Sequence, residues 1–252
     1  MRASIVGLVG LLLALTSFAA AQSAGFPSDR WLEGSLSVSG GRELAYRLLP
    51  PAPRAGSEEA RSAPLVVLLH GLGGSGRDNR ARGIHSFDVL ASPAVRSSYP
   101  AYLLTPQLPA GMGWEATDAD PLVAVAELTE RVVREHRVDP GRIYLVGEGS
   151  GAEAARRLAI RAPGRYAAVV LLSGVERPAG ADELAGVPLW VFHGAEDERY
   201  PVAAARALVS ALWAADARAV RYTEYPELGH ASWERAWEEP RLLPWLFSQR
   251  RE

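Results

Sequence analysis

An aspartate and a histidine in the later part of the chain have the types and spacing of an acid–base pair. Asp197 follows one short apolar run, and His230 follows the next one. A buried carboxylate can orient an imidazole and stabilise the imidazolium that forms when the ring takes up a proton, as acyl-transfer chemistry requires. We therefore predict that Asp197 orients His230 and that His230 is a general base.

A glycine-rich segment lies much earlier, directly after the apolar run Leu65–Leu69. It reads His70-Gly71-Leu72-Gly73-Gly74-Ser75-Gly76. A turn of this composition can bring backbone N–H groups close to a ligand, where they stabilise developing negative charge. We predict that the N–H of Leu72 is such an oxyanion donor. His70 and His193, each at the end of an apolar run, are expected to hold backbone in place.

The group that should attack a carbonyl carbon is missing from its usual place. Between the glycine-rich segment and Asp197 the chain reads Gly147-Glu148-Gly149-Ser150-Gly151, after an apolar run and before a helical pattern. A Gly-x-Ser-x-Gly motif on such a strand-to-helix turn presents a nucleophilic serine, and here its central position is Gly149. A shift by one residue makes Ser150 the nucleophile, but it puts Glu148 where the tight turn needs a small residue. We predict that Gly149 occupies the nucleophile position and that the N–H of Ser150 is the second oxyanion donor, with Ser150 as a weaker substitute nucleophile.

The elements that must position these residues alternate between short apolar runs and helical patterns. This alternation is typical of strands that are buried on both faces of a largely parallel sheet. Asp120 and Pro121 begin one predicted helix, and Gly40-Gly41 join two segments predicted to form a β-hairpin. The stretch Gly174–Val187 is too short to fold as a lid, so we expect a site open to solvent. Strands are predicted at 65–69, 102–105, 143–146, 167–172, 189–192 and 220–225, and further helices at 152–160 and 202–214.

Composition limits the classes of partner. The formal net charge is -2, and the basic residues form no block or stripe, so nucleic acid is not an expected partner. The chain has no cysteine, and its sequence shows no cluster of metal ligands. We therefore expect no disulfide, no metal and no cofactor.

The first 21 residues have the pattern of a secretory signal peptide. An apolar run from Ile5 to about Leu15 follows Arg2, and Ala19-Ala20-Ala21 form a small-residue cleavage site. The alternative is an uncleaved anchor, which needs about 20 apolar residues. We predict cleavage at or near Gln22, which leaves a single domain over 22–252 in the periplasm or the medium, without stable membrane insertion.

From about Pro64 to Trp245, the sequence resembles the bacterial phospholipase/carboxylesterase-type α/β-hydrolases, a group related to feruloyl esterases, polyhydroxybutyrate depolymerases and prolyl-oligopeptidase-like esterases. In those relatives the turn typically reads Gly-Leu-Ser-Met-Gly-Gly, and Leu-Ala follows nine and ten residues after the serine. Leu158-Ala159 stand at that distance from Gly149. The resemblance implies an α/β-hydrolase fold and hydrolysis of small-molecule or polymeric esters. The agreeing segments are 64–79, 105–107, 139–144, 193–202 and 229–233.

The glycine at position 149 leaves two functions open. One is a carboxylesterase that turns over poorly, either through Ser150 or through water activated by His230. The other is a non-catalytic binding protein that uses the vacated pocket, for which Trp114 and Trp233 are candidate lining residues.

A third and remote interpretation concerns the glycines of the same turn. The pattern Gly147-x-Gly149-x-x-Ala152 matches a dinucleotide-binding fingerprint, with Glu176 as a possible ribose ligand. This interpretation leaves Asp197 and His230 unexplained.

Overall fold

The computed structural model describes residues 31–38, 42–52, 62–76, 78, 84–116 and 120–251. The chain divides into two units, Met1–Arg30 and Trp31–Glu252, and every described element belongs to the second unit. The predicted signal peptide and its cleavage site at Gln22 therefore lie outside the described residues.

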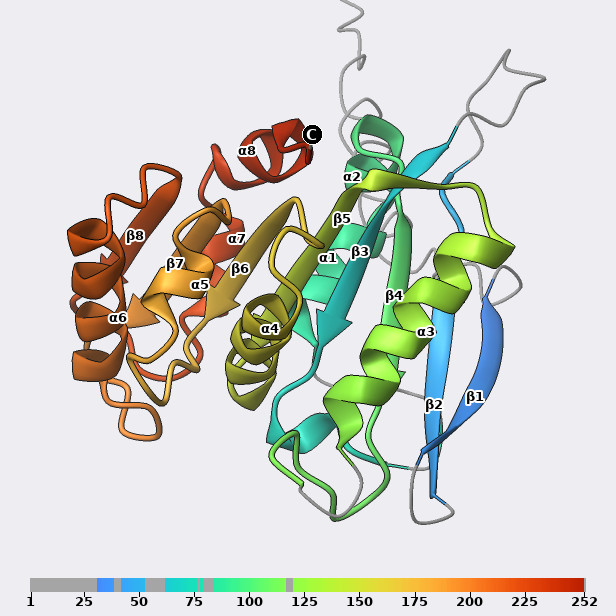
Figure 1. Ribbon diagram of the computed structural model, residues 1–252, viewed down its shortest axis with the longest axis horizontal. Coiled ribbons are helices and arrows are strands. Elements are labelled where there is room, and N and C mark those ends of the chain that lie inside the picture. Colours follow the sequence, from blue (N-terminus) through green and yellow to red (C-terminus); the bar gives the residue numbers. More distant parts are fainter. Residues whose placement is uncertain are drawn as a thin grey trace, which may run out of the picture. The chain divides into compact units, whose positions relative to one another are not determined.

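The described strands of the second unit form one eight-stranded sheet in the order β1-β2-β4-β3-β5-β6-β7-β8 (Figure 1). β1 and β2 pair antiparallel as the predicted hairpin, β2 pairs antiparallel with β4, and the pairs from β4 to β8 are parallel. The expected α/β fold with a mostly parallel sheet is thus confirmed. The strands are β1 Leu32–Val38, β2 Arg42–Leu49, β3 Ala63–Leu69, β4 Tyr102–Gln107, β5 Val138–Glu148, β6 Ala168–Leu172, β7 Leu189–Gly194 and β8 Val220–Tyr225.

Helices cover both faces of the sheet. Figure 1 shows α3, α4 and α6 in front of the sheet and α1 and α7 behind it. The helices are α1 His85–Ala91, α2 Pro93–Ser98, α3 Pro121–Glu135, α4 Ser150–Arg161, α5 Ala181–Leu184, α6 Val202–Ala214, α7 Trp233–Trp237 and α8 Leu242–Ser248, with a 3-10 turn, η3, at Leu72–Gly74. Between β6 and β7 the described chain forms only the four-residue α5, so no lid domain is inserted there.

The continuous apolar runs are explained by two separate cores, one on each face. Alternate side chains of a strand point to opposite faces, so Leu65, Val67 and Leu69 of β3 pack with α3, α4 and α6. Val66 and Leu68 of the same strand pack with α1, α7 and α8. All five side chains are fully buried. Because neither face of β3 meets water, its sequence shows no polar alternation.

The start of α3 could be predicted because it has a local cause. Pro121 stands at its first position, and the Asp120 side chain accepts a hydrogen bond of 3.0 Å from the N–H of Leu122. The helix predicted at 202–214 has the observed bounds of α6, and α4 begins two residues before the predicted 152. The short helices α1, α2, α5, α7 and α8 were not predicted.

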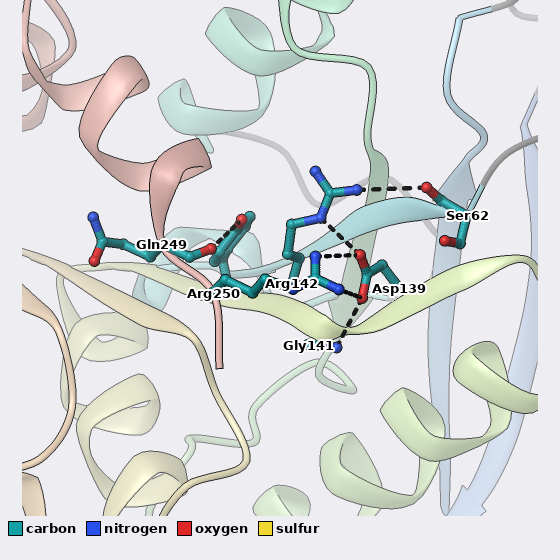
Figure 2. A network of polar contacts seen from close by, with 7 residues as sticks. Ser62, Asp139, Gly141, Arg142, Gln249 and Arg250 are labelled. Atoms are coloured by element: carbon teal, nitrogen blue, oxygen red, sulfur yellow. Dashed lines mark hydrogen bonds and ion pairs between the residues drawn. The ribbon is translucent and has the colours of Figure 1, made fainter. Parts of the chain in front are cut away.

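The C-terminal tail is fixed to the start of β5 by a polar network around Asp139 (Figure 2). The Asp139 carboxylate accepts hydrogen bonds from Arg142 at 2.9 Å, Arg250 at 2.8 Å and the N–H of Gly141 at 3.0 Å. The Tyr144 hydroxyl donates to the carbonyl of Gln249 at 2.9 Å. Partial burial acts against ionisation, but the bonds from Arg250 and Arg142 outweigh it and hold the pKa of Asp139 below its ordinary value.

Candidate active site

The predicted site residues follow the carboxyl ends of strands in one half of the sheet. Gly149 follows β5, Asp197 follows β7 and His230 follows β8, and these strands run parallel in the order β5-β6-β7-β8. Parallel strands present their carboxyl ends at one edge, where open α/β sheets place their ligands. The topology therefore gathers residues that lie far apart in the sequence.

Asp197 and His230 form a direct hydrogen-bonded pair. The Nδ1 of His230 lies 2.9 Å from Oδ2 of Asp197, whose side chain is fully buried while that of His230 is 20% exposed. The other carboxylate oxygen accepts backbone hydrogen bonds from Arg199 at 2.9 Å and Tyr200 at 3.0 Å. These bonds fix the carboxylate in position. Because the carboxylate holds the His230 ring through Nδ1, the Nε2 of the ring points away from it.

A second histidine, His193, contacts the same carboxylate. Its Nε2 donates to the Tyr200 carbonyl at 2.8 Å and lies 3.4 Å from Oδ2 of Asp197. Burial lowers the pKa of His193, so the ring is neutral near pH 7, although the Tyr200 carbonyl and Asp197 act in the opposite direction. The Tyr200 ring in turn stacks on His230, with centroids 5.4 Å apart. His193 thus ties down backbone, and it also supports the acid–base pair through Tyr200, a role that sequence reasoning missed.

The strand-to-helix turn places Gly149 directly opposite His230. Gly149 is the N-cap of α4 with φ 54° and ψ -124°, a backbone conformation that side chains with a Cβ rarely adopt. A Cβ built on this residue would lie 3.3 Å from Nε2 and 3.5 Å from Cε1 of His230. The free nitrogen of the acid–base pair therefore faces the direction in which a side chain at position 149 would point.

Ser150 lies one residue further on, inside the first turn of α4. It is 7% exposed, and its hydroxyl oxygen is buried without a hydrogen-bond partner in the described part of the chain. The structure thus gives the special backbone conformation to Gly149 and an ordinary helical position to Ser150.

Two backbone N–H groups, those of Leu72 and Ser150, directly follow Gly71 and Gly149 in the chain. Leu72 begins η3 shortly after β3, and its side chain is 63% exposed. The Cα of the preceding Gly71 lies 3.8 Å from the built Cβ of Gly149. Within the described ranges, no acceptor is found for the N–H of Leu72 or of Ser150. These are the two N–H groups that the sequence predicts as oxyanion donors.

Glu148 links the turn to the opposite face of the sheet. It is 2% exposed, and its carboxylate accepts hydrogen bonds from the N–H groups of His85 at 3.2 Å and Ser86 at 2.6 Å, at the start of α1, and from the Ser86 hydroxyl. The Ser86 hydroxyl also accepts from the Trp237 indole at 2.9 Å. Burial raises the pKa of Glu148, against the hydrogen bonds from Ser86 and His85 that favour the carboxylate. This network joins α1 and α7 to the residue beside Gly149, and no local sequence signal indicates it.

The two candidate tryptophans lie in different environments. Trp233 meets the His230 ring edge-on, with centroids 4.9 Å apart. Trp114 is 2% exposed, and its indole N–H donates to the carbonyl of His70 at 2.8 Å. The structure therefore places Trp114 in the core, where it supports the glycine-rich segment, and not at the surface of a pocket.

The structure gives the glycines of the turn a packing role. A Cβ at Gly147 would collide with the backbone of Gly151, and a Cβ at Gly151 would collide with the backbone of Leu69. Close approach of strand and helix thus accounts for Gly147, the first glycine of the pattern that resembles a dinucleotide fingerprint, and the positive φ accounts for Gly149. Glu176 is exposed, and its backbone N–H donates to Glu153 at 3.3 Å.

The described residues contain no group of three or more His, Cys, Asp or Glu side chains suited to hold a metal ion. None of their helices is both long and apolar enough to span a membrane.

Comparisons with known proteins identify relatives of this chain. Residues 44–210 match the family model "Esterase PHB depolymerase". The "Putative esterase NocK" of Nocardia uniformis subsp. tsuyamanensis is 30% identical over 177 residues, which cover 65% of this chain and 48% of NocK. A crystal structure of a thermostable esterase has a TM-score of 0.81 at 30% identity and covers 88% of this chain and 64% of its own. This chain thus spans less than two thirds of the length of either relative.

More distant structures share the fold. A ferulic acid esterase has a TM-score of 0.68 at 17% identity, with 86% of this chain and 97% of its own covered. At this identity the likeness concerns the α/β-hydrolase fold alone.

Proposed function

Because this chain belongs to the Esterase PHB depolymerase family, we propose that it binds carboxylic esters at a site formed by Gly149, Asp197 and His230. We further propose that it lacks the hydroxyl needed to form an acyl-enzyme. Such a site retains the parts that recognise a carbonyl group and has lost the atom that attacks it. The chain is then an esterase-type binding protein that turns esters over only slowly.

One observation carries this proposal. The Nε2 of His230 lies 3.3 Å from the place where a Cβ at position 149 would be. A nucleophile must lie within hydrogen-bond reach of its general base, and position 149 meets this requirement. Ser150 is the first residue of α4 and does not have the turn conformation of Gly149. The residue at the required position has no side chain.

The remaining groups support binding and only slow hydrolysis. The Asp197–His230 pair can still deprotonate a water molecule, and the Leu72 and Ser150 N–H groups can still polarise a carbonyl. Direct attack by water forgoes the covalent intermediate, and loss of the nucleophile in a serine hydrolase lowers turnover by about six orders of magnitude. Because no lid covers this edge of the described fold, bulky or polymeric esters are included among the ligands we propose.

Side-by-side kinetics of the wild-type protein and Gly149→Ser on p-nitrophenyl butyrate test this function. We expect wild-type turnover to be at least a thousandfold below that of the variant, because only the variant places a hydroxyl beside Nε2. Adding His230→Gln to the variant should abolish the gain. A wild-type turnover of ~10 per second, ordinary for an enzyme, would contradict the proposal.

We also propose that the protein is exported to the periplasm or the medium. The support is the sequence of residues 1–21, which has the charge, the apolar run and the small-residue site of a signal peptide. We expect cleavage at or near Gln22, with residues 22–252 as the mature single-domain protein.

A further inference from the structure

We propose that the vacated site binds free carboxylic acids. One carboxylate oxygen occupies the place of a serine hydroxyl beside His230, and the other lies at the N–H groups of Leu72 and Ser150. The inference rests on the proposed function, because it takes Gly149 as the nucleophile position. It goes beyond that function by naming an anionic ligand that the site prefers to an ester.

An open place lies between His230 and the glycine-rich segment. The Cβ that Gly149 lacks would lie 3.3 Å from Nε2 of His230 and 3.8 Å from the Cα of Gly71. Two of the residues around this place, Gly149 and Gly71, therefore have no side chain. A ligand oxygen can lie near it, in van der Waals contact with Gly149 and about 2.8 Å from the imidazole nitrogen, a normal hydrogen-bond distance.

A carboxylate has the shape of the group that would fill this space. In an acyl-enzyme of a serine esterase, the serine oxygen is bonded to the acyl carbon, and the carbonyl oxygen lies at the oxyanion donors. A free carboxylate has the same two oxygens on one carbon. With Gly149 in place of serine, the ligand supplies both oxygens, so the bound acid occupies the position of the acyl-enzyme without a covalent bond to the protein.

The partial charge at this place favours an anion. α4 is a 12-residue helix whose N-terminal end carries a partial positive charge, and the N–H of Ser150 belongs to this end. Nδ1 of His230 is bonded to Asp197 at 2.9 Å, so a carboxylic acid and the free Nε2 share one proton, whichever of the two brings it. An ester or an amide forms no such charge-assisted bond, so the acid should bind more tightly than either.

Calorimetric titration with sodium butyrate tests the inference, with butyramide as the neutral ligand of the same shape. We expect butyrate to bind the wild-type protein at least tenfold more tightly than butyramide. Gly149→Ala should weaken butyrate binding at least tenfold, because the new methyl group fills the place of the oxygen. Gly164→Ala is the matched control: Gly164 also has a positive φ, 72°, but nothing lies within 4 Å of its Cβ position, so butyrate binding should not change.

Equal affinity for butyrate and butyramide, or undiminished butyrate binding by Gly149→Ala, overturns the inference. If Gly149→Ala does not fold, His230→Gln replaces it, and it too should weaken butyrate binding at least tenfold; unchanged binding overturns the inference. If Gly149→Ser gains esterase activity while the wild-type protein fails to bind butyrate, the inference fails and the proposed function stands. If butyrate binds as expected and Gly149→Ser folds but remains inactive, the proposed function fails instead.

Discussion

Replacing Gly149 by alanine is expected to lower the stability of the fold, although it adds only a methyl group. At φ 54° and ψ -124°, a residue with a Cβ pays about 1 to 3 kcal/mol of backbone strain. Alanine also lowers the conformational entropy of the unfolded chain, which offsets about 0.4 to 1 kcal/mol of this loss. The Cβ would also lie 3.3 Å from Nε2 of His230, but that ring is 20% exposed and can shift, so this contact adds little. The net loss should be about 1 to 2 kcal/mol.

Thermal unfolding measures this loss. For a unit of this size, 1 kcal/mol corresponds to roughly 2 to 4 °C, so the melting temperature should fall by roughly 2 to 8 °C. Gly164→Ala is the control. Gly164 has φ 72° and open space around its Cβ position, so this variant measures the cost of a positive φ where the new methyl group has no close neighbour. Gly149→Ala should cost at least as much as this control. An unchanged or higher melting temperature for Gly149→Ala would refute the argument that the turn is strained for residues with a side chain.

Three further predictions concern other parts of the chain. N-terminal sequencing of secreted protein should begin at or near Gln22, and recovery of only full-length protein in membranes would contradict export. Ser150→Ala should leave any slow ester hydrolysis unchanged, and a loss of this hydrolysis would assign the nucleophile to Ser150. Asp139→Asn should lower the free energy of unfolding at pH 7 by about 1 to 2 kcal/mol, because Arg142 and Arg250 lose an ionised acceptor. Since the pKa of Asp139 is lower in the folded protein than its ordinary 3.8, this stabilisation is present above that pH and is lost as the pH falls through the folded-state pKa. Denaturant titrations of both proteins should therefore converge in acid, and a constant difference down to about pH 2 would contradict this assignment.

The sheet could be predicted because its causes are local. The runs 65–69 and 189–192 are apolar throughout, since both faces of these strands are buried, and they lie within β3 and β7. The helix α3 could be predicted for the same reason, from its Asp120 cap and Pro121. By contrast, the first N–H groups of α1 donate to the carboxylate of Glu148, which lies far away in the sequence. No signal within residues 85–91 indicates this contact.

The candidate site could be predicted in part. Chain order places Asp197 and His230 after neighbouring parallel strands, and the glycine spacing places Gly149 at the turn. The contact of His193 with Asp197 could not be predicted, because it depends on how residues 194–200 fold back. Trp114 was expected to line the pocket and instead lies in the core, because its indole binds the backbone of His70. Both cases depend on loop conformations, which periodicity does not report.

The central claim is that position 149 is the nucleophile position and that its side chain is absent. Labelling with a fluorophosphonate probe, followed by intact mass and peptide mapping, tests this claim most directly, because the probe marks only a serine activated by a base. We predict that the wild-type protein remains unlabelled and that Gly149→Ser is labelled at position 149 in a manner that requires His230. Labelling of the wild-type protein at Ser150, or a folded Gly149→Ser protein that takes up no probe, would contradict the account.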